Sequence, residues 1–213
     1  MPNWTTCKLE APAEVISKYL SKDEEGHTNF DFNLVIPRPK IYDDPEMIEG
    51  GDTGWCIYWY LSERGTIDIS KLKALYPGLI SPWTINYGEK MIGSTDPDKA
   101  YERGKKYVDA YKKYGYTTWY SWSNANWGTK WNACDTYYDE NSGTLVEFDT
   151  AWCPPMPVIE KIFKDNPGKA ITFTSYDEDY SGHYELFHDE NNEVHEDTYW
   201  IEECANDYDE EEK

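Results

Sequence analysis

Residues 144–176 read TLVEFDTAWCPPMPVIEKIFKDNPGKAITFTSY, and their pattern predicts three consecutive elements of the fold. Polar and apolar residues alternate over residues 144–151, which is typical of a strand, although neither face is cleanly apolar. Cys-Pro-Pro then ends the strand. Apolar residues at helical spacing between Val158 and Phe163 predict a helix, and residues 170–176 predict a second strand. The stretch therefore predicts a strand, a helix and a strand in succession.

The N-terminal part of the chain adds further elements. Residues 4–10 alternate weakly and indicate a first strand, and a helix is expected to begin at Pro12, because proline suits the first helical turn. Residues 30–37, FDFNLVIP, indicate a second strand. A hairpin is expected between residues 134–138 and 144–151, because the Asn and Gly between them supply the backbone conformations of a tight turn.

A long, mostly helical segment separates these two parts, at about residues 38–130. Its clearest helix is expected at residues 97–114, with Asp96 as the N-cap and Gly115 as the C-terminal stop. Residues 54–61, GWCIYWYL, are apolar throughout. They fit either a buried strand or a short buried helix, which periodicity cannot separate.

Without that segment the predicted order is β-α-β-β-α-β, the ferredoxin-like split unit, in which two helices cover one face of an antiparallel sheet. A further hairpin is expected at residues 183–188 and 194–199. The predicted fold class is thus α+β, with a single ferredoxin-like domain over residues 1–203 that contains the inserted helical lobe at about 38–130. An acidic C-terminal tail is expected at residues 204–213.

The net charge of the chain is −21, and it is unevenly distributed. Residues 177–213 contain 16 of the 41 acidic residues and one of the 20 basic ones, a net charge of −15. Such a surface repels phosphate backbones and anionic lipid and attracts basic surfaces. Two interpretations fit: a contribution to solubility, or a binding surface that mimics the charge of nucleic acid. The residues predicted for the partner-binding surface are Asp177, Glu178, Asp179, Glu185, Asp189, Glu190, Glu193, Glu196 and Asp197.

The five cysteines and the start of the chain indicate the compartment. The cysteines are widely spaced and form no CxxC pair, which favours reduced thiols over a disulfide framework. Residues 1–4, MPNW, lack the basic end and apolar run of a signal peptide. No stretch approaches the roughly 20 apolar residues that a membrane span needs. We therefore expect a cytoplasmic protein that does not bind membranes.

Three blocks of sequence carry a resemblance to a known family. They are MPNW at residues 1–4, NWGTKWNA at residues 126–133 and FDTAWCPPMPVIE at residues 148–160, with YSG at residues 180–182 after them. In this order they resemble the YubB-type ferredoxin-like family of phage- and plasmid-encoded proteins, which is largely uncharacterised. The resemblance implies a fold and a mobile-element setting and implies no reaction. A Cys commonly follows PNW in that family, whereas Thr5 stands here, which weakens any expectation of a metal or thiol at this end.

The block at residues 126–133 also predicts a candidate ligand pocket. Its aromatic rings would form a floor, with amide and ammonium groups at the rim, suited to a sugar, a nucleotide base or a peptide. Alternatively the tryptophans fill the seam between sheet and helix while the asparagines bond to turn backbone, and we favour this structural interpretation. The residues concerned are Asn126, Trp127, Lys130, Trp131, Asn132 and Trp152.

No pattern predicts catalysis, a cofactor or a metal ion. The chain has no GxSxG, HExxH, P-loop or Rossmann glycine pattern. His188 and His195 would face each other if the strands pair around residues 189–193, but zinc binding needs three or four converging ligands. Two surface histidines beside acidic residues are the simpler expectation.

These observations together predict a non-enzymatic binding protein of a phage or mobile element, located in the cytoplasm of the host cell. The expected partner is a host protein with a basic surface, for example a nucleic-acid-handling defence system that the protein inhibits, as anti-CRISPR or anti-restriction proteins do. One alternative is a small-ligand-binding module or an uncharacterised enzyme that uses the block around Trp131. A second alternative is binding of single-stranded nucleic acid, which the negative charge opposes.

Overall fold

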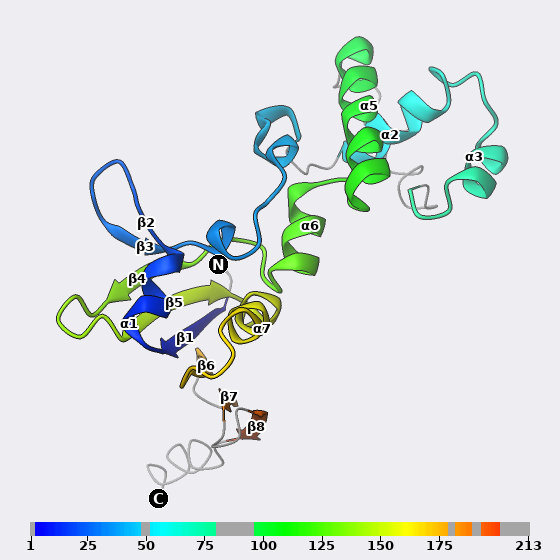
Figure 1. The fold of residues 1–213 in the computed structure, drawn as a ribbon. Coiled ribbons are helices and arrows are strands. Elements are labelled where there is room, and N and C mark those ends of the chain that lie inside the picture. Colours follow the sequence, from blue (N-terminus) through cyan, green and yellow to red (C-terminus); the bar gives the residue numbers. More distant parts are fainter. Residues whose placement is uncertain (1–2, 48–51, 80–95, 179–181, 189–192, 201–213) are drawn as a thin grey trace, which may run out of the picture. The chain divides into compact units, whose positions relative to one another are not determined.

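The computed structural model describes residues 3–47, 52–79, 96–178, 182–188 and 193–200, which form a mixed α+β structure (Figure 1). The chain divides into two compact units. Unit 1 comprises Met1–Pro37 and Ser123–Lys213, and unit 2 comprises Arg38–Trp122. The acidic tail expected at residues 204–213 lies outside the described residues. The single domain with a lobe at about 38–130 stays a prediction.

A six-stranded antiparallel sheet is the centre of unit 1. The strand order is β4-β5-β1-β6-β7-β8. Its strands lie where the sequence predicts them, including those of both hairpins. Their bounds are Trp4–Glu10 for β1, Cys134–Tyr138 for β4, Leu145–Ala151 for β5, Thr172–Asp177 for β6, Gly182–His188 for β7 and Val194–Trp200 for β8.

One face of this sheet is buried under helices. Alternate residues of the central strands point to it, so that Leu9, Phe148 and Phe173 are almost inaccessible to solvent. Helix α7 (Met156–Asp165) follows β5 as predicted, and its four buried residues run from Val158 to Phe163. Helix α1 (Ala13–Ile16) and the 3-10 turn Ser17–Tyr19 follow β1.

The strand predicted at residues 30–37 is wrong. The structure has a two-stranded sheet of β2 (Leu20–Lys22) and β3 (Thr28–Phe30), followed by a 3-10 turn at Phe32–Leu34. The turn forms because the Asp31 carboxylate accepts a hydrogen bond from the Asn33 amide at 3.0 Å, a local bond that competes with strand pairing. Phe30 and Phe32 still reach the core, where both rings contact Phe148.

Unit 2 is helical. It contains 3-10 turns at Lys40–Asp43 and Pro45–Met47, then α2 (Thr53–Leu61), α3 (Ile69–Leu75) and α5 (Pro97–Tyr114), and α6 (Trp119–Asn126) crosses the boundary between the units. The apolar run at residues 54–61 is therefore a helix and not a strand.

Helix α5 has the predicted ends. The Asp96 side chain accepts from the amides of Asp98 and Lys99, and Gly115 adopts the left-handed conformation with φ of 82°. On its outer side, the Arg103 guanidinium bonds to both carboxylate oxygens of Asp52, at 2.7 and 3.3 Å. Lys106 pairs with Asp44 and Glu46. These cations stabilise unit 2 internally.

Candidate functional site

The face of the sheet opposite α7, called the open face here, carries acidic side chains on four strands. Residues of β1, β5 and β6 on this face are exposed or half-buried apart from Ala151, in alternation with buried ones on the helix side. The strand register aligns the exposed positions across the sheet. The carboxylates on the open face are Glu10, Glu147, Asp149, Glu185 and Asp197, beside one cation on β1, Lys8.

The internal contacts of the open face leave most of this charge uncompensated. Lys8 forms an ion pair with Glu10 at 3.2 Å. Thr6 donates its hydroxyl to the Asp149 carboxylate at 3.0 Å. Glu185 and Asp197 are directly opposite each other on β7 and β8. Like charges in that position destabilise a sheet, so a cationic group bound between them would relieve the repulsion.

The acidic residues predicted from the sequence do not form one surface. Glu185 and Asp197 lie on the open face, whereas Glu196 points to the helix side with Leu186, its register partner. Glu193 is exposed ahead of β8. Asp177 ends β6, and the Glu178 carboxylate accepts from the Trp4 amide at 3.2 Å. Asp179, Asp189 and Glu190 lie outside the described residues.

Sequence reasoning missed three carboxylates of the open face: Glu10, Glu147 and Asp149. They occur in segments of low net charge and stand out only when alternate residues of separate strands are aligned. The sequence of residues 145–150 does indicate that Glu147 and Asp149 share a face, because side chains alternate between the two faces of a strand. The strand order that brings them beside Glu185 could not be obtained from the alternation alone.

Two members of the predicted ligand pocket are structural. The Trp127 side chain is 1% exposed, its Nε1–H donates to the Ile36 carbonyl at 2.9 Å, and its ring meets Phe32 edge-on. The side-chain Oδ1 of Asn132 accepts from the Phe32 amide at 2.8 Å, and its Nδ2 donates to the Asp31 carboxylate at 2.8 Å. These two side chains fix the segment that follows β3.

The other aromatic members are accessible to solvent at the start of β1 and the end of β5. Trp131 is 38% exposed, its ring lies 6.0 Å from Trp4, and the Lys130 ammonium sits 3.8 Å from the Trp131 ring centre. Trp152 is 56% exposed and has a φ of 75°, which is rare for a bulky residue. Trp4, Lys130, Trp131 and Trp152 are called the aromatic edge below. Asn126, half-buried at the end of α6, belongs to neither group.

His188 and His195 do not face each other, because the strand register differs by one residue from the one that would pair them. His195 is opposite Phe187 in the register, and the two rings stack at 5.6 Å. His188 is opposite Val194 and contacts Phe163 of α7, so the two histidines lie on opposite faces of the sheet. Among the described residues, no three His, Cys, Asp or Glu side chains converge as a metal site would require.

The two buried cysteines, Cys7 and Cys56, are not nucleophiles. All four described cysteines are free thiols. Burial raises the pKa of the Cys7 thiol strongly and that of Cys56 to about 11, so both stay protonated and unreactive at neutral pH. Cys7 contacts the Thr150 hydroxyl inside the sheet, where it packs as a small apolar residue.

Comparisons with known proteins give one structural likeness. No family model and no curated protein matches the chain. The structure is similar to the crystal structure of protein api92 from Yersinia pseudotuberculosis, a DUF1281 protein, at 11% sequence identity and a TM-score of 0.43. The alignment covers 94% of this chain and 99% of that one. None of the described helices is both long and apolar enough to cross a membrane.

Proposed function

We propose that the protein acts without catalysis, by binding a partner with a basic surface through the open face. The observation that carries this proposal is the register, which gathers Glu10, Glu147, Asp149, Glu185 and Asp197 on one face of a hydrogen-bonded sheet. Because the sheet fixes the strands, the carboxylates are held in a defined array. A fixed anionic array complements a groove of Lys and Arg side chains and raises the rate of encounter with it.

The partner class that this chemistry favours is a nucleic-acid-handling protein. Such proteins hold phosphates in cationic grooves, and an array of carboxylates that occupied the groove would block it. In this proposal the protein is an inhibitor of anti-CRISPR or anti-restriction type, encoded by a phage or mobile element and acting in the host cytoplasm. The resemblance of residues 126–133 and 148–160 to the YubB-type family supports the setting.

A ferredoxin-like arrangement of unit 1 is part of the same proposal. The neighbours β4, β5, β1 and β6 have the order expected for strands two, three, one and four of a β-α-β-β-α-β unit. Helix α7 joins the third and fourth strands, and α1 with its 3-10 extension follows the first. In this arrangement one face of the sheet is left without helices, which is where the acidic side chains lie.

Single-stranded nucleic acid is a poor ligand for this face. Sheets of this kind hold bases on exposed aromatic rings while cations neutralise the phosphates. Here Lys8 is the cation of the described open face, and its ammonium is paired with Glu10. Phosphates would therefore meet carboxylates, which is unfavourable at any ionic strength low enough for electrostatic binding.

Neutralising the open face is expected to weaken partner binding at least about tenfold. The test variant combines Glu147→Gln, Asp149→Asn, Glu185→Gln and Asp197→Asn. The control variant also removes four negative charges, but from exposed positions outside the open face: Glu24→Gln, Glu63→Gln, Glu102→Gln and Asp109→Asn. Each protein is immobilised, bacterial lysate is passed over it, and captured proteins are quantified by mass spectrometry.

Salt dependence provides a second readout of the same experiment. Capture by the wild-type protein should decline as ionic strength rises from about 0.1 M to about 1 M, because the screening length falls from about 10 Å to about 3 Å. The proposal fails if the two variants lose capture equally, since net charge and not the open face would then be responsible. It also fails if capture is unchanged across the salt series.

The aromatic edge supports a second candidate function, the binding of a planar ring from a base, a sugar or a peptide. The specific observation is Trp152, a large aromatic side chain that is 56% exposed on a left-handed backbone. Strained and exposed residues of this kind gather at functional sites, and base stacking on one ring contributes about 1–3 kcal/mol.

Replacing Trp152 with alanine should reduce binding of such a ring at least about fivefold, if the aromatic edge is a binding site. Fluorescence titration with mononucleotides and simple sugars measures this, with Trp59→Ala in unit 2 as the tryptophan control. An unchanged affinity in the Trp152 variant, or no detectable binding to the wild-type protein, excludes this function for the tested ligands.

A further inference from the structure

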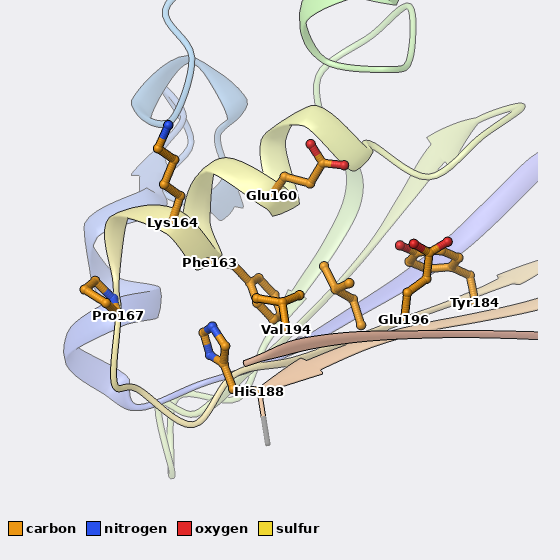
Figure 2. A pocket seen from close by; sticks show the side chains of 9 residues that line it. Glu160, Phe163, Lys164, Pro167, Tyr184, His188, Val194 and Glu196 are labelled. Carbon is orange, nitrogen blue, oxygen red and sulfur yellow. The ribbon is translucent and has the colours of Figure 1, made fainter. Parts of the chain in front are cut away.

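A cavity lies on the helix side of the sheet, away from the open face. It has a volume of about 420 Å³ and is formed by α7 together with β7 and β8 (Figure 2). This volume is within the range of small-molecule sites. We call it the helix-side pocket; its lining residues are Glu160, Phe163, Lys164, Pro167, Tyr184, Leu186, His188, Val194 and Glu196.

The middle of the helix-side pocket is apolar. Phe163 from α7 and Leu186 from β7 are buried and form its floor. Val194 from β8 is 51% exposed, an unusual position for an aliphatic side chain that borders a cavity. Figure 2 shows Phe163 and Val194 between His188 at one end and Tyr184 with Glu196 at the other. A ligand with an apolar body would cover Val194 and remove it from water.

The end near Tyr184 is strongly anionic. Burial, and after it the carboxylates of Glu196 and Glu160, raise the pKa of the Tyr184 phenol to about 12. The two carboxylates come from different elements, Glu160 from α7 and Glu196 from β8. Both residues line the same cavity as Tyr184. A single positive charge at this end of the cavity would be attracted by both carboxylates.

At the other end of the helix-side pocket, the His188 ring is held in place by contacts within the protein. The Nδ1 atom of His188 lies 2.8 Å from the Lys169 carbonyl, so this nitrogen carries the proton and donates it. The His188 ring packs on Phe163 at 4.8 Å between ring centres. These two contacts hold the imidazole as a wall of the pocket without help from a ligand. Lys164 is at the rim on the outer side of α7, where Figure 2 shows its ammonium pointing away from Tyr184.

We infer that the helix-side pocket binds a small organic ammonium ion with an apolar body, such as an arylalkylamine. The ammonium group lies between Glu160 and Glu196 beside the Tyr184 hydroxyl. The apolar body lies along Phe163 and Leu186 and ends at His188. Anionic ligands are rejected by the two carboxylates, and neutral analogues lose the charge interaction while retaining the apolar contact. This site is independent of the open face, since Glu196 and Glu185 point to opposite sides of the same hairpin.

Calorimetric titration with 2-phenylethylamine tests the inference directly. The wild-type protein should bind the amine at least about tenfold more tightly than 2-phenylethanol, its neutral analogue, because one charge-assisted contact of this kind is worth roughly a factor of ten. Glu196→Gln should weaken amine binding by about the same factor. Glu185→Gln, a matched change on the opposite face of the hairpin, should leave it unchanged.

Nuclear magnetic resonance locates the ligand in the same samples. Addition of the amine should shift the side-chain resonances of Phe163 and His188 in the wild-type protein. The inference is overturned if the amine does not bind, if the alcohol binds as tightly, or if Glu185→Gln and Glu196→Gln weaken binding equally. Loss of capture by the open-face variant, with amine binding intact, would separate this site from the proposed function.

Discussion

Replacing Trp127 with alanine is expected to lower the free energy of unfolding by about 3–5 kcal/mol, the usual cost of truncating a buried tryptophan. The indole is 1% exposed, and Phe32 meets its ring edge-on at 5.8 Å. Truncation opens a cavity beside Phe32 and leaves the Ile36 carbonyl without its 2.9 Å bond from Nε1. Chemical denaturation followed by far-ultraviolet circular dichroism measures the change.

Trp152→Ala is the matched control, because this residue is of the same type, belongs to the same unit and is 56% exposed. Its cost should stay below about 1 kcal/mol. If the Trp127→Ala protein does not fold, Trp127→Phe retains most of the ring and should cost about 1–3 kcal/mol through the unpaired carbonyl. A Trp127→Ala protein as stable as the control would contradict the structural role of Trp127.

Replacing Gly104 with alanine is expected to destabilise unit 2 by about 3 kcal/mol, at the upper end for overpacking. Gly104 lies in the middle of α5, where α2 passes against it. An added Cβ would overlap the Cys56 carbonyl oxygen and lie 2.6 Å from its carbon and 2.8 Å from the Tyr60 Cβ. Two of these neighbours are backbone atoms, so a change of rotamer cannot relieve the overlap.

The sign of this effect is diagnostic. Alanine is the better helix former by about 1 kcal/mol. If no atom lay close to Gly104, the same substitution would therefore stabilise the protein. Glu102→Ala, at an exposed position of α5, should alter stability by less than about 0.5 kcal/mol. Hydrogen exchange of the α2 and α5 amides measures both variants. Unchanged or slower exchange in Gly104→Ala would disprove the close packing of these helices.

The elements that the sequence predicted well are those set by local physics. Helix α5 begins at an Asp-Pro pair and ends at Gly115, where the side chain and backbone signals are sufficient by themselves. Strand β5 follows from the alternation of polar and apolar residues over 144–151. The strand predicted at residues 30–37 is absent for two reasons: Asp31 closes a local turn on the Asn33 amide, and Asn132, far along the chain, accepts from the Phe32 amide that strand pairing would use.

The candidate sites depend on contacts that a linear pattern does not contain. The charge count drew attention to residues 177–213, yet the array on the open face combines Glu185 and Asp197 with Glu147 and Asp149 from another hairpin. The helix-side pocket likewise joins α7 to β7 and β8, and its charged end is visible only when Glu160 is placed beside Tyr184. In both cases the residue types can be read from the sequence, but which of them lie next to one another in the fold cannot.

Carboxylate footprinting tests the central claim most directly. The protein, alone and bound to its captured partner, is treated with a carbodiimide and glycine amide, and the modification of each Asp and Glu is measured by mass spectrometry. Binding through the open face predicts that Glu147, Asp149, Glu185 and Asp197 become protected together, while Glu102 and Asp109 react as before. Protection confined to residues of unit 2 or of α7, with the four open-face carboxylates still fully reactive, would contradict it.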